Sequence, residues 1–419
     1  MNRIEESYRI AKETYAELGV DTDKAIEKLS KLSISLHCWQ GDDVQGFEKS
    51  GEDLSGGIAV TGNFPGRARS IDELRKDLEM VYTLLAGKHR LNLHALYGDF
   101  GNEKVDRNEL ETTHFKSWVD WSKSLGVKLD FNATFFSHPK ASSGFTLSDT
   151  RAEIRSFWIE HAYRCREITA YFGKQQGDAS VHNLWIPDGS KDLTVNRFLH
   201  RRLLVESLDE IFKQPLMDTE IVDVLESKLF GIGSESFVVG SHEFYMGYAM
   251  QNKLAVCYDM GHFHPTESIA DKISASLQFM PRLLLHVSRG VRWDSDHVVI
   301  LNDDLRYLAE EIVRADAMDR TIVALDFFDA SINRIGAWVT GTRATQKAFL
   351  LALLEPIGKL REYESQGKNY ERLALLEEAK GLPWSAVWNY FLLKNNAPQG
   401  LEVIDKIQKY EKDILLNRK

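Results

Sequence analysis

Residues 321–334 read TIVALDFFDASINR, and this stretch decides the fold that the sequence predicts. It opens with apolar and β-branched residues, a pattern typical of a strand that is buried on both faces of a parallel sheet. The apolar run ends in Asp326 and Asp329, which lie on either side of two phenylalanines. Acidic residues at the end of a buried strand are expected where the acid points into a site rather than into water.

Seven more apolar runs precede this one, and a stretch with helical periodicity follows each of them. Eight alternating strand–helix units predict a parallel sheet closed into a (β/α)8 barrel, with additional N- and C-terminal helices. An open doubly wound sheet is the alternative, and it is disfavoured because no glycine-rich phosphate loop follows the first strand. The predicted strands cover residues 34–40, 91–98, 127–136, 181–189, 221–231, 253–261, 283–290 and 321–329.

The predicted domain organisation is one catalytic barrel with a helical extension. Residues 1–370 form the barrel with its N-terminal helices, and residues 371–419 form further helices packed on the barrel or on a neighbouring subunit. The glycine-rich segment at about 41–69 is long for a connection without secondary structure and is predicted to be a lid. Asp21 or Thr22, and Ser70, are expected helix N-caps. The predicted helices cover 3–30 with a break near 19–21, 70–87, 112–125, 148–172, 196–213, 235–251, 265–280, 303–317 and 343–365.

The composition excludes several classes of function. The 419 residues carry a formal net charge of −10 without a basic run, which argues against a nucleic-acid surface. Three cysteines, far apart and odd in number, fit a reducing compartment rather than a disulfide framework. The N-terminal segment lacks the apolar core of a signal peptide, and no apolar run reaches membrane-spanning length. We therefore expect a soluble cytoplasmic protein.

Each predicted strand ends near a residue that can bind a metal ion or a substrate. The carboxyl ends of barrel strands meet at one face, so these side chains are expected to converge. Carboxylates with one imidazole suit a hard divalent cation such as Mn²⁺, Mg²⁺ or Co²⁺. Two adjacent cations would activate a water and clamp substrate oxygens. The first predicted metal site comprises Glu226, Asp259, His286 and Asp326, and the second comprises His262, Asp294 and Asp296.

Taken alone, each of these residues has an ordinary structural explanation. A single Asp at a strand end is more often a turn or helix-cap residue, and His286 within an apolar run is typical of a hydrogen-bonded core residue. Lys228 is either a salt-bridge partner of Glu226 or, beside cations, a proton donor. Trp39 and Trp185 are either core residues or aromatic platforms for a sugar. Their placement at the ends of several strands favours a site.

Several long motifs resemble those of the L-rhamnose isomerase family, and the resemblance extends over essentially the whole chain. They read NLWIPDGSKD from Asn183, LESKLFGIGSESFVVGSHEFYMGYA from Leu225, DMGHFHPTESIADKISA from Asp259, LLLHVSRGVRWDSDHVVIL from Leu283, LDFFDASINRIGAWVTGTR from Leu325 and LLEPIGKLREYE from Leu353.

The resemblance implies a cytoplasmic, Mn²⁺-dependent aldose–ketose isomerase that converts L-rhamnose to L-rhamnulose, on a barrel that is usually a homotetramer. It implies that His262, Asp294 and Asp296 bind Mn²⁺. The four residues of the first predicted site match the family's other metal site. At that site Co²⁺, Mg²⁺ or Zn²⁺ could replace Mn²⁺. No ligand of either site is replaced in this sequence.

Roles for individual residues follow from the two lines of reasoning together. Asp294 and Asp296 are candidates for moving a proton between O1 and O2 of the sugar, and Lys228 is expected to assist at O1. His94 is expected to open the sugar ring. Two routes for the transfer of hydrogen between C2 and C1 remain open, a hydride shift and proton abstraction through an enediol. The predicted substrate-binding residues are Trp39, Trp185 and Asp329, with Trp39 and the lid enclosing the C6 methyl group.

Three other functions compete with this interpretation. The first is an isomerase that acts mainly on another aldose such as xylose, mannose or allose, and a comparison of specificity constants across these sugars would distinguish it. A metal-dependent phosphodiesterase would need a basic groove for phosphates, which this acidic chain does not provide. A sugar-binding barrel without turnover is the non-enzymatic alternative, and the intact ligand set argues against it.

Overall fold

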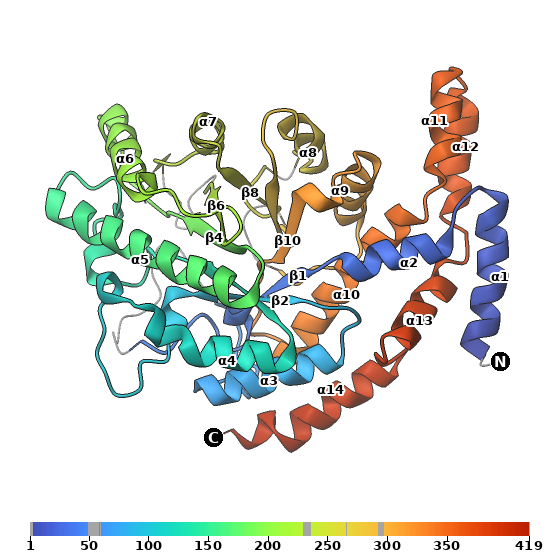
Figure 1. Cartoon of the computed structure of the whole chain (residues 1–419), viewed down its shortest axis with the longest axis horizontal. Helices are drawn as coiled ribbons and strands as arrows, with labels where there is room; N and C mark the ends of the chain where they lie inside the picture. The colour runs from blue at the N-terminus through green and yellow to red at the C-terminus, as the bar shows by residue number, and fades with distance from the viewer. Residues whose placement is uncertain are drawn as a thin grey trace.

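Eight parallel strands close into a barrel in the computed structural model of the chain, which confirms the predicted (β/α)8 fold (Figure 1). The structure describes residues 3–48, 58, 60–228, 236–264, 266–291 and 297–418. The barrel strands, in their order around the barrel, are β1 (Ile34–His37), β10 (Thr321–Leu325), β9 (Leu283–Val287), β8 (Ala255–Asp259), β6 (Ile221–Glu226), β4 (Ser180–Trp185), β3 (Lys128–Asn132) and β2 (Arg90–His94). Two short strands, β5 (Gly189–Ser190) and β7 (Phe237–Val238), pair outside the barrel.

The barrel closes because the first strand pairs with both the second and the last. Leu36 of β1 is the Cα partner of Leu91 of β2, and Ile34 is the partner of Val323 of β10. The sequence predicted all eight barrel strands, but each of them ends earlier than predicted, and the short strands β5 and β7 were not predicted. After His37, for example, the chain leaves the ladder in a short 3₁₀ helix, Cys38–Gln40. The residues expected at strand ends are therefore partly on turns beyond the ladder.

Helices surround the barrel, and the sequence predicted most of them. Asp21 and Ser70 are N-caps as expected: Asp21 accepts hydrogen bonds from the backbone amides of the second helix, and Ser70 accepts one from the third. The helices are α1 (Arg3–Glu17), α2 (Thr22–Lys31), α3 (Ile71–Thr83), α4 (Lys116–Leu125), α5 (Ala152–Gln176), α6 (Arg197–Phe212), α7 (His242–Asn252), α8 (Ala270–Ser276), α9 (Asp303–Arg314), α10 (Arg334–Leu353), α11 (Ile357–Ser365), α12 (Asn369–Ala379), α13 (Trp384–Lys394) and α14 (Glu402–Asp413).

Several helix boundaries were predicted wrongly. The helix expected over 235–251 begins only at His242, after strand β7, and the helix expected over 265–280 is the shorter α8. A single helix was expected over 343–365, but α10 begins at Arg334, and Pro356 separates it from α11. Asn333 caps α10 by accepting a hydrogen bond from the amide of Gly336 at 2.9 Å. Proline has no backbone N–H to donate and clashes with the preceding helical turn, so it ends α10 before residue 356.

The barrel interior is apolar on one side and polar on the other. On the polar side, Asp130 of β3 accepts hydrogen bonds from the Ser35 hydroxyl, the Arg90 guanidinium and the backbone amide of Val181. One buried carboxylate thus connects the four adjacent strands β1 to β4. The apolar side is a separate cluster of hydrophobic residues, Val181, Val222, Val224, Ala255, Cys257, Leu284 and Ala324.

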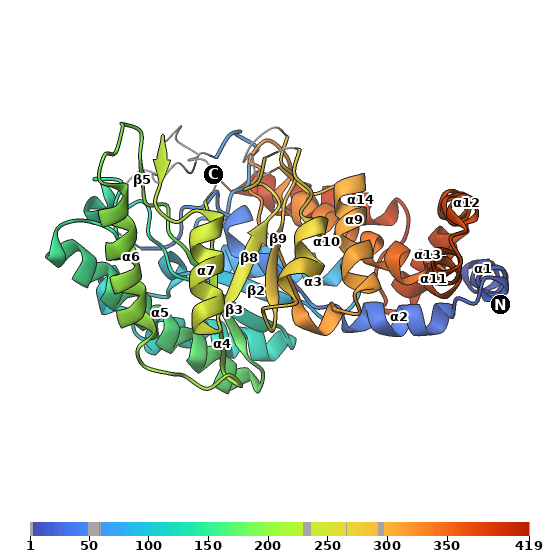
Figure 2. The ribbon, with the colours of Figure 1, turned by 90° about the horizontal axis from the view of Figure 1, so that it is seen from above.

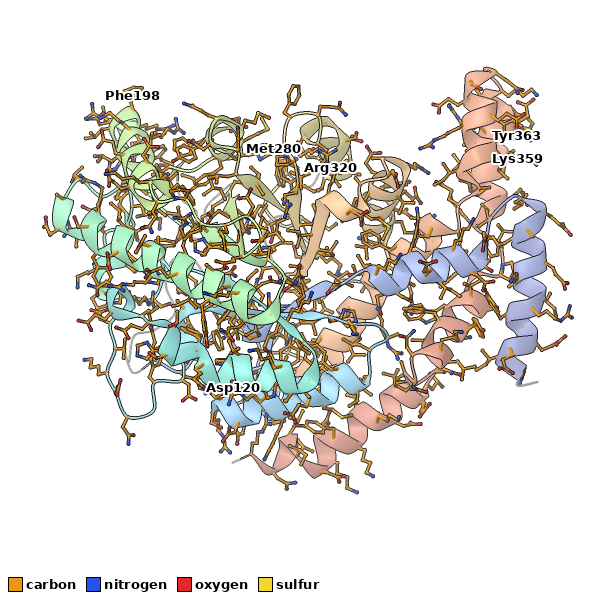
Figure 3. The ribbon with its side chains drawn as sticks, in the orientation of Figure 1. Asp120, Phe198, Met280, Arg320, Lys359 and Tyr363 are labelled. Atoms are coloured by element: carbon orange, nitrogen blue, oxygen red, sulfur yellow. The ribbon has the colours of Figure 1, made fainter. Side chains whose placement is uncertain are left out.

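Some helices near the two ends of the chain lie away from the barrel. Figure 2 shows α1, α11 and α12 at one end of the molecule, beyond the helices that surround the strands, and Lys359 and Tyr363 of α11 lie there (Figure 3). On α12, Tyr370 and Leu373 are 78% and 60% exposed. The last two helices pack against the barrel helices again: the Tyr410 hydroxyl donates a hydrogen bond to Asp77 of α3, and the Arg418 guanidinium forms an ion pair with it. Within the described residues, no helix combines the length and the apolar character needed to cross a membrane.

The Asp130 network yields a prediction for stability. Replacing Asp130 by Ala leaves the Arg90 guanidinium buried with one partner fewer, and we expect this to lower the free energy of unfolding by about 3–5 kcal/mol. Urea unfolding followed by tryptophan fluorescence measures the change. Asp178→Ala is the matched control, because the Asp178 side chain is 45% exposed and its ion pairs with Arg90 and Lys128 are worth about 1 kcal/mol or less. Equal losses in the two variants would contradict the assigned role of Asp130.

Candidate active site

Four side chains converge where β6, β8, β9 and β10 end. They are three carboxylates and one imidazole, and their ligand atoms all lie within 4.8 Å of one another. The Nδ1 atom of His286 is 3.2 Å from Glu226 Oε1, 3.1 Å from Asp326 Oδ2 and 3.6 Å from Asp259 Oδ2. The structure therefore brings together the four residues of the first predicted metal site.

Two neighbouring side chains orient the carboxylates of this cluster. The indole N–H of Trp39 donates a hydrogen bond to Asp326 Oδ1 at 3.0 Å. The side-chain amide of Asn183 donates to Glu226 Oε2. Each bond occupies one oxygen of its carboxylate and leaves the other oxygen facing His286. The second oxygen of each acid is thus directed to a common point.

The donor atoms of the cluster fit a divalent cation. Asp259 Oδ1 accepts hydrogen bonds from the amide of Gly261 and the hydroxyl of Ser288, at 2.6 and 3.0 Å. Its Oδ2 atom, 3.6 Å from His286 Nδ1, is buried without a hydrogen-bond partner in the described part of the chain. Buried polar atoms are normally paired, and three carboxylate oxygens with an imidazole form a donor set for a hard divalent metal.

The charges of the cluster are strongly coupled. Burial acts to lower the pKa of His286, but the acidic groups around it, including Glu226 and Asp326, outweigh burial and raise that pKa well above its usual range. Burial acts to raise the pKa of Asp326, and the charge of His286 outweighs it and lowers that pKa. An imidazolium thus compensates part of the acidic charge, and a bound cation would compensate it more fully.

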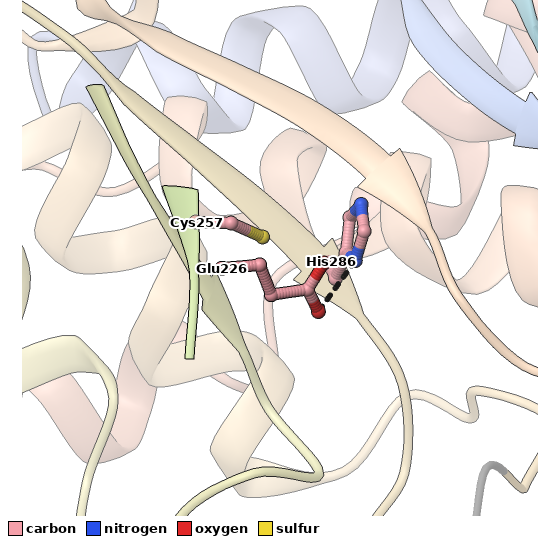
Figure 4. A group of neighbouring side chains, drawn as sticks. All are labelled: Glu226, Cys257 and His286. Atoms are coloured by element: carbon pink, nitrogen blue, oxygen red, sulfur yellow. Dashed lines mark hydrogen bonds and ion pairs between the residues drawn. The ribbon is translucent and has the colours of Figure 1, made fainter. Parts of the chain in front are cut away.

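Cys257 also lies beside Glu226 and His286, as Figure 4 shows. No role at a metal site was predicted for this cysteine. Burial raises the pKa of this thiol far above its usual range, so the sulfur stays protonated. Because the thiolate is the form that binds metals, the carboxylate–imidazole set is the better cation site.

The second predicted metal site is described only in part. His262 is buried, and its Nδ1 atom lies 2.7 Å from the carbonyl oxygen of Ser227 and 3.5 Å from Glu226 Oε1. A ring nitrogen that faces a carbonyl donates its proton, so the lone pair of His262 is on Nε2. Asp294 and Asp296 lie outside the described residues, and their assignment stays a prediction.

A cavity opens directly above the acidic cluster. It contains residues from the strand ends, from the turns that follow them and from the predicted lid. Most of its apolar lining was not named from the sequence, because an isolated Val, Ile or Phe in a loop carries no signal of its own. The described lining residues are Trp39, Val44, Ile58, His94, Asn132, Phe136, Asn183, Trp185, Glu226, His262, His286, Asp326 and Phe328.

His94, the predicted ring-opening residue, lines this cavity as a neutral imidazole. Burial lowers its pKa to about 3. Its Nδ1 atom lies 2.9 Å from the hydroxyl of Thr134, and its Nε2 atom lies 3.3 Å from the side-chain amide nitrogen of Asn132. The amide donates to Nε2, so the lone pair is on Nε2 and the Nδ1 proton goes to Thr134. The imidazole is therefore arranged as a proton acceptor.

The other predicted substrate residues divide into two groups. Trp39 and Trp185 line the cavity, and the Lys228 ammonium lies 5.8 Å from the centre of the Trp185 ring. Asp329 is not among the described lining residues: its carboxylate accepts hydrogen bonds from the backbone amide and the hydroxyl of Ser331. The geometry therefore gives Asp329 a turn-forming contact, and its substrate role stays a prediction.

The lid segment meets the cavity through a backbone that is held in an unusual conformation. Val44 has a φ of 59°, which is costly for a β-branched residue. Neighbouring contacts fix it there: the Asp43 carboxylate is 2.8 Å from the Arg334 guanidinium, and Asp42 accepts a 2.6 Å hydrogen bond from Tyr97. The segment 41–48 is thus fastened to α10 and to the turn after β2.

A closed parallel barrel with acids and an imidazole at its carboxyl-terminal mouth defines the chain as a barrel enzyme. The family model for L-rhamnose isomerase (RhaA) matches residues 2–418. L-rhamnose isomerases of Enterobacter sp. (strain 638) and Bacteroides thetaiotaomicron are 53% and 55% identical, with 99% of both chains covered in each case. That of Rhodopirellula baltica is 52% identical and covers 100% of this chain and 98% of its own. The chain belongs to the L-rhamnose isomerase family and is an isomerase.

The contact between Trp39 and Asp326 yields a prediction for metal binding. Trp39→Phe removes the indole donor and keeps an aromatic ring, and we expect the affinity for Mn²⁺ to fall at least tenfold, the usual effect of losing a hydrogen bond to a ligand. Isothermal titration calorimetry of the metal-free protein measures this. Trp118→Phe is the control, since the Trp118 indole donates to the carbonyl of Tyr97, outside the lining of the cavity. Unchanged Mn²⁺ affinity in Trp39→Phe would refute the assignment.

Proposed function

We propose that the chain is a cytoplasmic, divalent-metal-dependent isomerase that interconverts L-rhamnose and L-rhamnulose by transfer of hydrogen between C2 and C1 of the open-chain sugar. The observation that carries the proposal is the cluster of Glu226, Asp259, His286 and Asp326 at the floor of the cavity, in a chain of this family. The three cysteines are free and buried, which supports a reducing compartment.

The acidic cluster and the segment around Asp294 and Asp296 would hold one or two cations. We assign Mn²⁺ to the His262, Asp294 and Asp296 site, with Mn²⁺, Co²⁺, Mg²⁺ or Zn²⁺ at the cluster. A bound divalent cation polarises a carbonyl and lowers the pKa of a hydroxyl that it contacts, which is the chemistry that C1 and C2 of an aldose require. The protein supplies the positions of the ligands, through Trp39 and Asn183 among others.

His94 would act before the isomerisation step. An aldose in solution is mostly a closed ring, so the ring must open before C1 becomes a carbonyl. When the anomeric hydroxyl takes the place of the Asn132 amide at Nε2, the neutral imidazole can accept the proton of that hydroxyl and return a proton to the ring oxygen. Burial keeps His94 neutral, and Thr134 fixes the orientation of its ring.

Lys228 and the two aspartates would act at O1 and O2. The Lys228 side chain is buried beside Trp185, within reach of the same strand end that carries Glu226. Its ammonium stabilises negative charge that develops on O1. Asp294 and Asp296 would carry the proton between O2 and O1. Trp185 and Trp39 would contact the apolar C–H surface of the sugar.

The substrate preference follows from the apolar part of the cavity. Val44 and Ile58 of the lid segment and Phe136 and Phe328 of the barrel line it together. Such a surface suits the C6 methyl group of a 6-deoxy sugar. An apolar pocket rejects an added hydroxyl only by about a hundredfold, so activity on other aldoses is part of the proposal.

We extend the proposal to domain organisation and assembly. Residues 1–370 would form the catalytic unit, and residues 371–419 would form a helical extension that contacts a neighbouring subunit in a homotetramer. The exposed apolar side chains of Tyr370 and Leu373 on α12 support this assembly. Most of the stability of a helix comes from packing against other elements, and α12 buries none of its residues within a single chain.

The first test of the proposal is metal-dependent turnover. Purified protein with added Mn²⁺ should convert L-rhamnose to a ketose, chelation should reduce the rate at least a hundredfold, and added Mn²⁺ should restore it. Ketose formation is measured by a colorimetric assay and confirmed by ¹³C NMR. Asp326→Asn removes one charge from the cluster and should lower the rate comparably even in excess Mn²⁺. Full activity after exhaustive chelation would exclude a metal mechanism.

The second test separates ring opening from the later steps. His94→Ala should lower kcat/KM for L-rhamnose about a hundredfold or more, the usual contribution of a general base. It should also abolish any acceleration of the interconversion of the α and β anomers, measured by exchange NMR, while Mn²⁺ affinity stays unchanged. His138→Ala is the control, because His138 pairs with Asp106 outside the lining of the cavity. Undiminished anomer exchange in His94→Ala would assign His94 another role.

A further inference from the structure

Two buried asparagines on neighbouring strands form part of the cavity wall. Asn132 of β3 and Asn183 of β4 are Cα partners in the parallel ladder, so their side chains lie side by side and point the same way. Both are almost completely buried, and both line the cavity. We call Asn132 and Asn183 the asparagine pair.

One member of the asparagine pair contacts the acidic cluster, and the other contacts His94. The amide nitrogen of Asn183 donates to Glu226, and the amide nitrogen of Asn132 donates to Nε2 of His94. These strands follow one another around the barrel in the order β2, β3, β4 and β6. The asparagine pair therefore lies between the ring-opening histidine and the acidic cluster.

The contacts of the two side-chain amide nitrogens determine which way the Oδ1 atoms of the asparagine pair point. Because a carboxylate only accepts hydrogen bonds, the Asn183 amide must present its nitrogen to Glu226, and its Oδ1 faces elsewhere. The Oδ1 atoms of both asparagines are buried and have no hydrogen-bond partner in the described residues. The Nε1 atom of Trp185, on the same wall, is also without such a partner there. Two acceptors and one donor are thus unsatisfied on one surface.

A buried polar atom without a partner costs about 1–3 kcal/mol, so such atoms are rare unless a ligand or water completes them. Ligand cavities are characterised by a few convergent polar groups of this kind on an otherwise apolar lining. An unpaired amide oxygen is a hydrogen-bond acceptor, and the matching donor is a hydroxyl. The lining of this cavity is otherwise rich in aromatic and aliphatic side chains.

We propose that the asparagine pair binds the hydroxyl groups at C3 to C5 of the open-chain sugar, each Oδ1 accepting one O–H hydrogen bond. This inference rests on the proposed function, which places O1 and O2 at the cations. An open chain that extends from the acidic cluster toward His94 passes along the asparagine pair. Trp185 Nε1 donates to an oxygen of the same chain. The pair therefore selects for hydroxyl positions, whereas the apolar residues select for the methyl group.

The test uses L-rhamnitol, an open-chain polyol that cannot be isomerised, so that binding is measured without turnover. The Mn²⁺-loaded full-length protein is titrated with L-rhamnitol by calorimetry. Asn132→Ala and Asn183→Ala should each weaken binding about tenfold, the effect of one lost hydrogen bond. Asn132→Asp keeps an acceptor oxygen in place and should recover most of that loss. All titrations use Mn²⁺ at saturation for each variant, so that altered metal affinity does not contribute.

Asn92→Ala is the matched control. Asn92 is a buried asparagine of β2 whose Oδ1 also lacks a partner in the described residues, but it lies outside the cavity lining. Its removal should leave the L-rhamnitol affinity within twofold, and circular dichroism checks that every variant is folded. Unchanged affinity in the two cavity variants, or equal losses in all three alanine variants, would overturn the inference. Wild-type protein that binds L-rhamnitol with the expected variant losses, yet does not isomerise L-rhamnose, would overturn the proposed function alone.

Discussion

The burial of three carboxylates around one imidazole is the constraint on which the rest of the site depends. Like charges a few ångströms apart in a low-dielectric interior repel one another unless a positive charge compensates them. In the protein alone His286 provides that charge, which is why its pKa rises although burial opposes the charged form. One imidazolium cannot balance Glu226, Asp259 and Asp326 together. The cluster is therefore unfavourable by itself, and a cation that binds it stabilises the folded chain.

The closure of the barrel determines whether this cluster can form. Trp39 follows β1 and Asp326 follows β10, so their hydrogen bond exists only because the first and last strands pair. The same junction carries a second, reciprocal contact. Gln40 and Asp329 exchange two hydrogen bonds, at 2.8 and 2.9 Å, between a side-chain amide and the backbone. The geometry of the acidic cluster thus depends on the pairing of β1 with β10, the two barrel strands that are farthest apart in the sequence.

The sequence predicted what depends on local pattern and missed what depends on contacts between strands. Glu226 and Asp326 could be predicted as site residues because each follows an apolar run, and in a (β/α)8 barrel the carboxyl ends of all strands meet at one face. Asp329 has nearly the same local context as Asp326, yet a turn at Ser331 uses its carboxylate. The asparagine pair could not be predicted as part of the site, because the role of an asparagine in a strand depends on its contacts with residues of other strands. The start of α10 was readable, since Asn333 is a common N-cap residue.

The proposed recognition of both a hydroxylated chain and a methyl group by one cavity would rest on the division of the barrel interior. Strands β1 to β4 carry polar side chains that are joined below the cavity by Asp130. The apolar lining comes partly from the lid segment, where Val44 occupies a strained backbone conformation. Strain of this kind persists only where surrounding contacts enforce it, and Asp43 provides such a contact through Arg334 of α10. The wall proposed to bind hydroxyl groups is thus built into the rigid ladder, whereas the surface proposed to bind the methyl group depends on a fastened loop. If these proposals hold, changes in that loop alter which sugar is preferred without disturbing the acidic cluster.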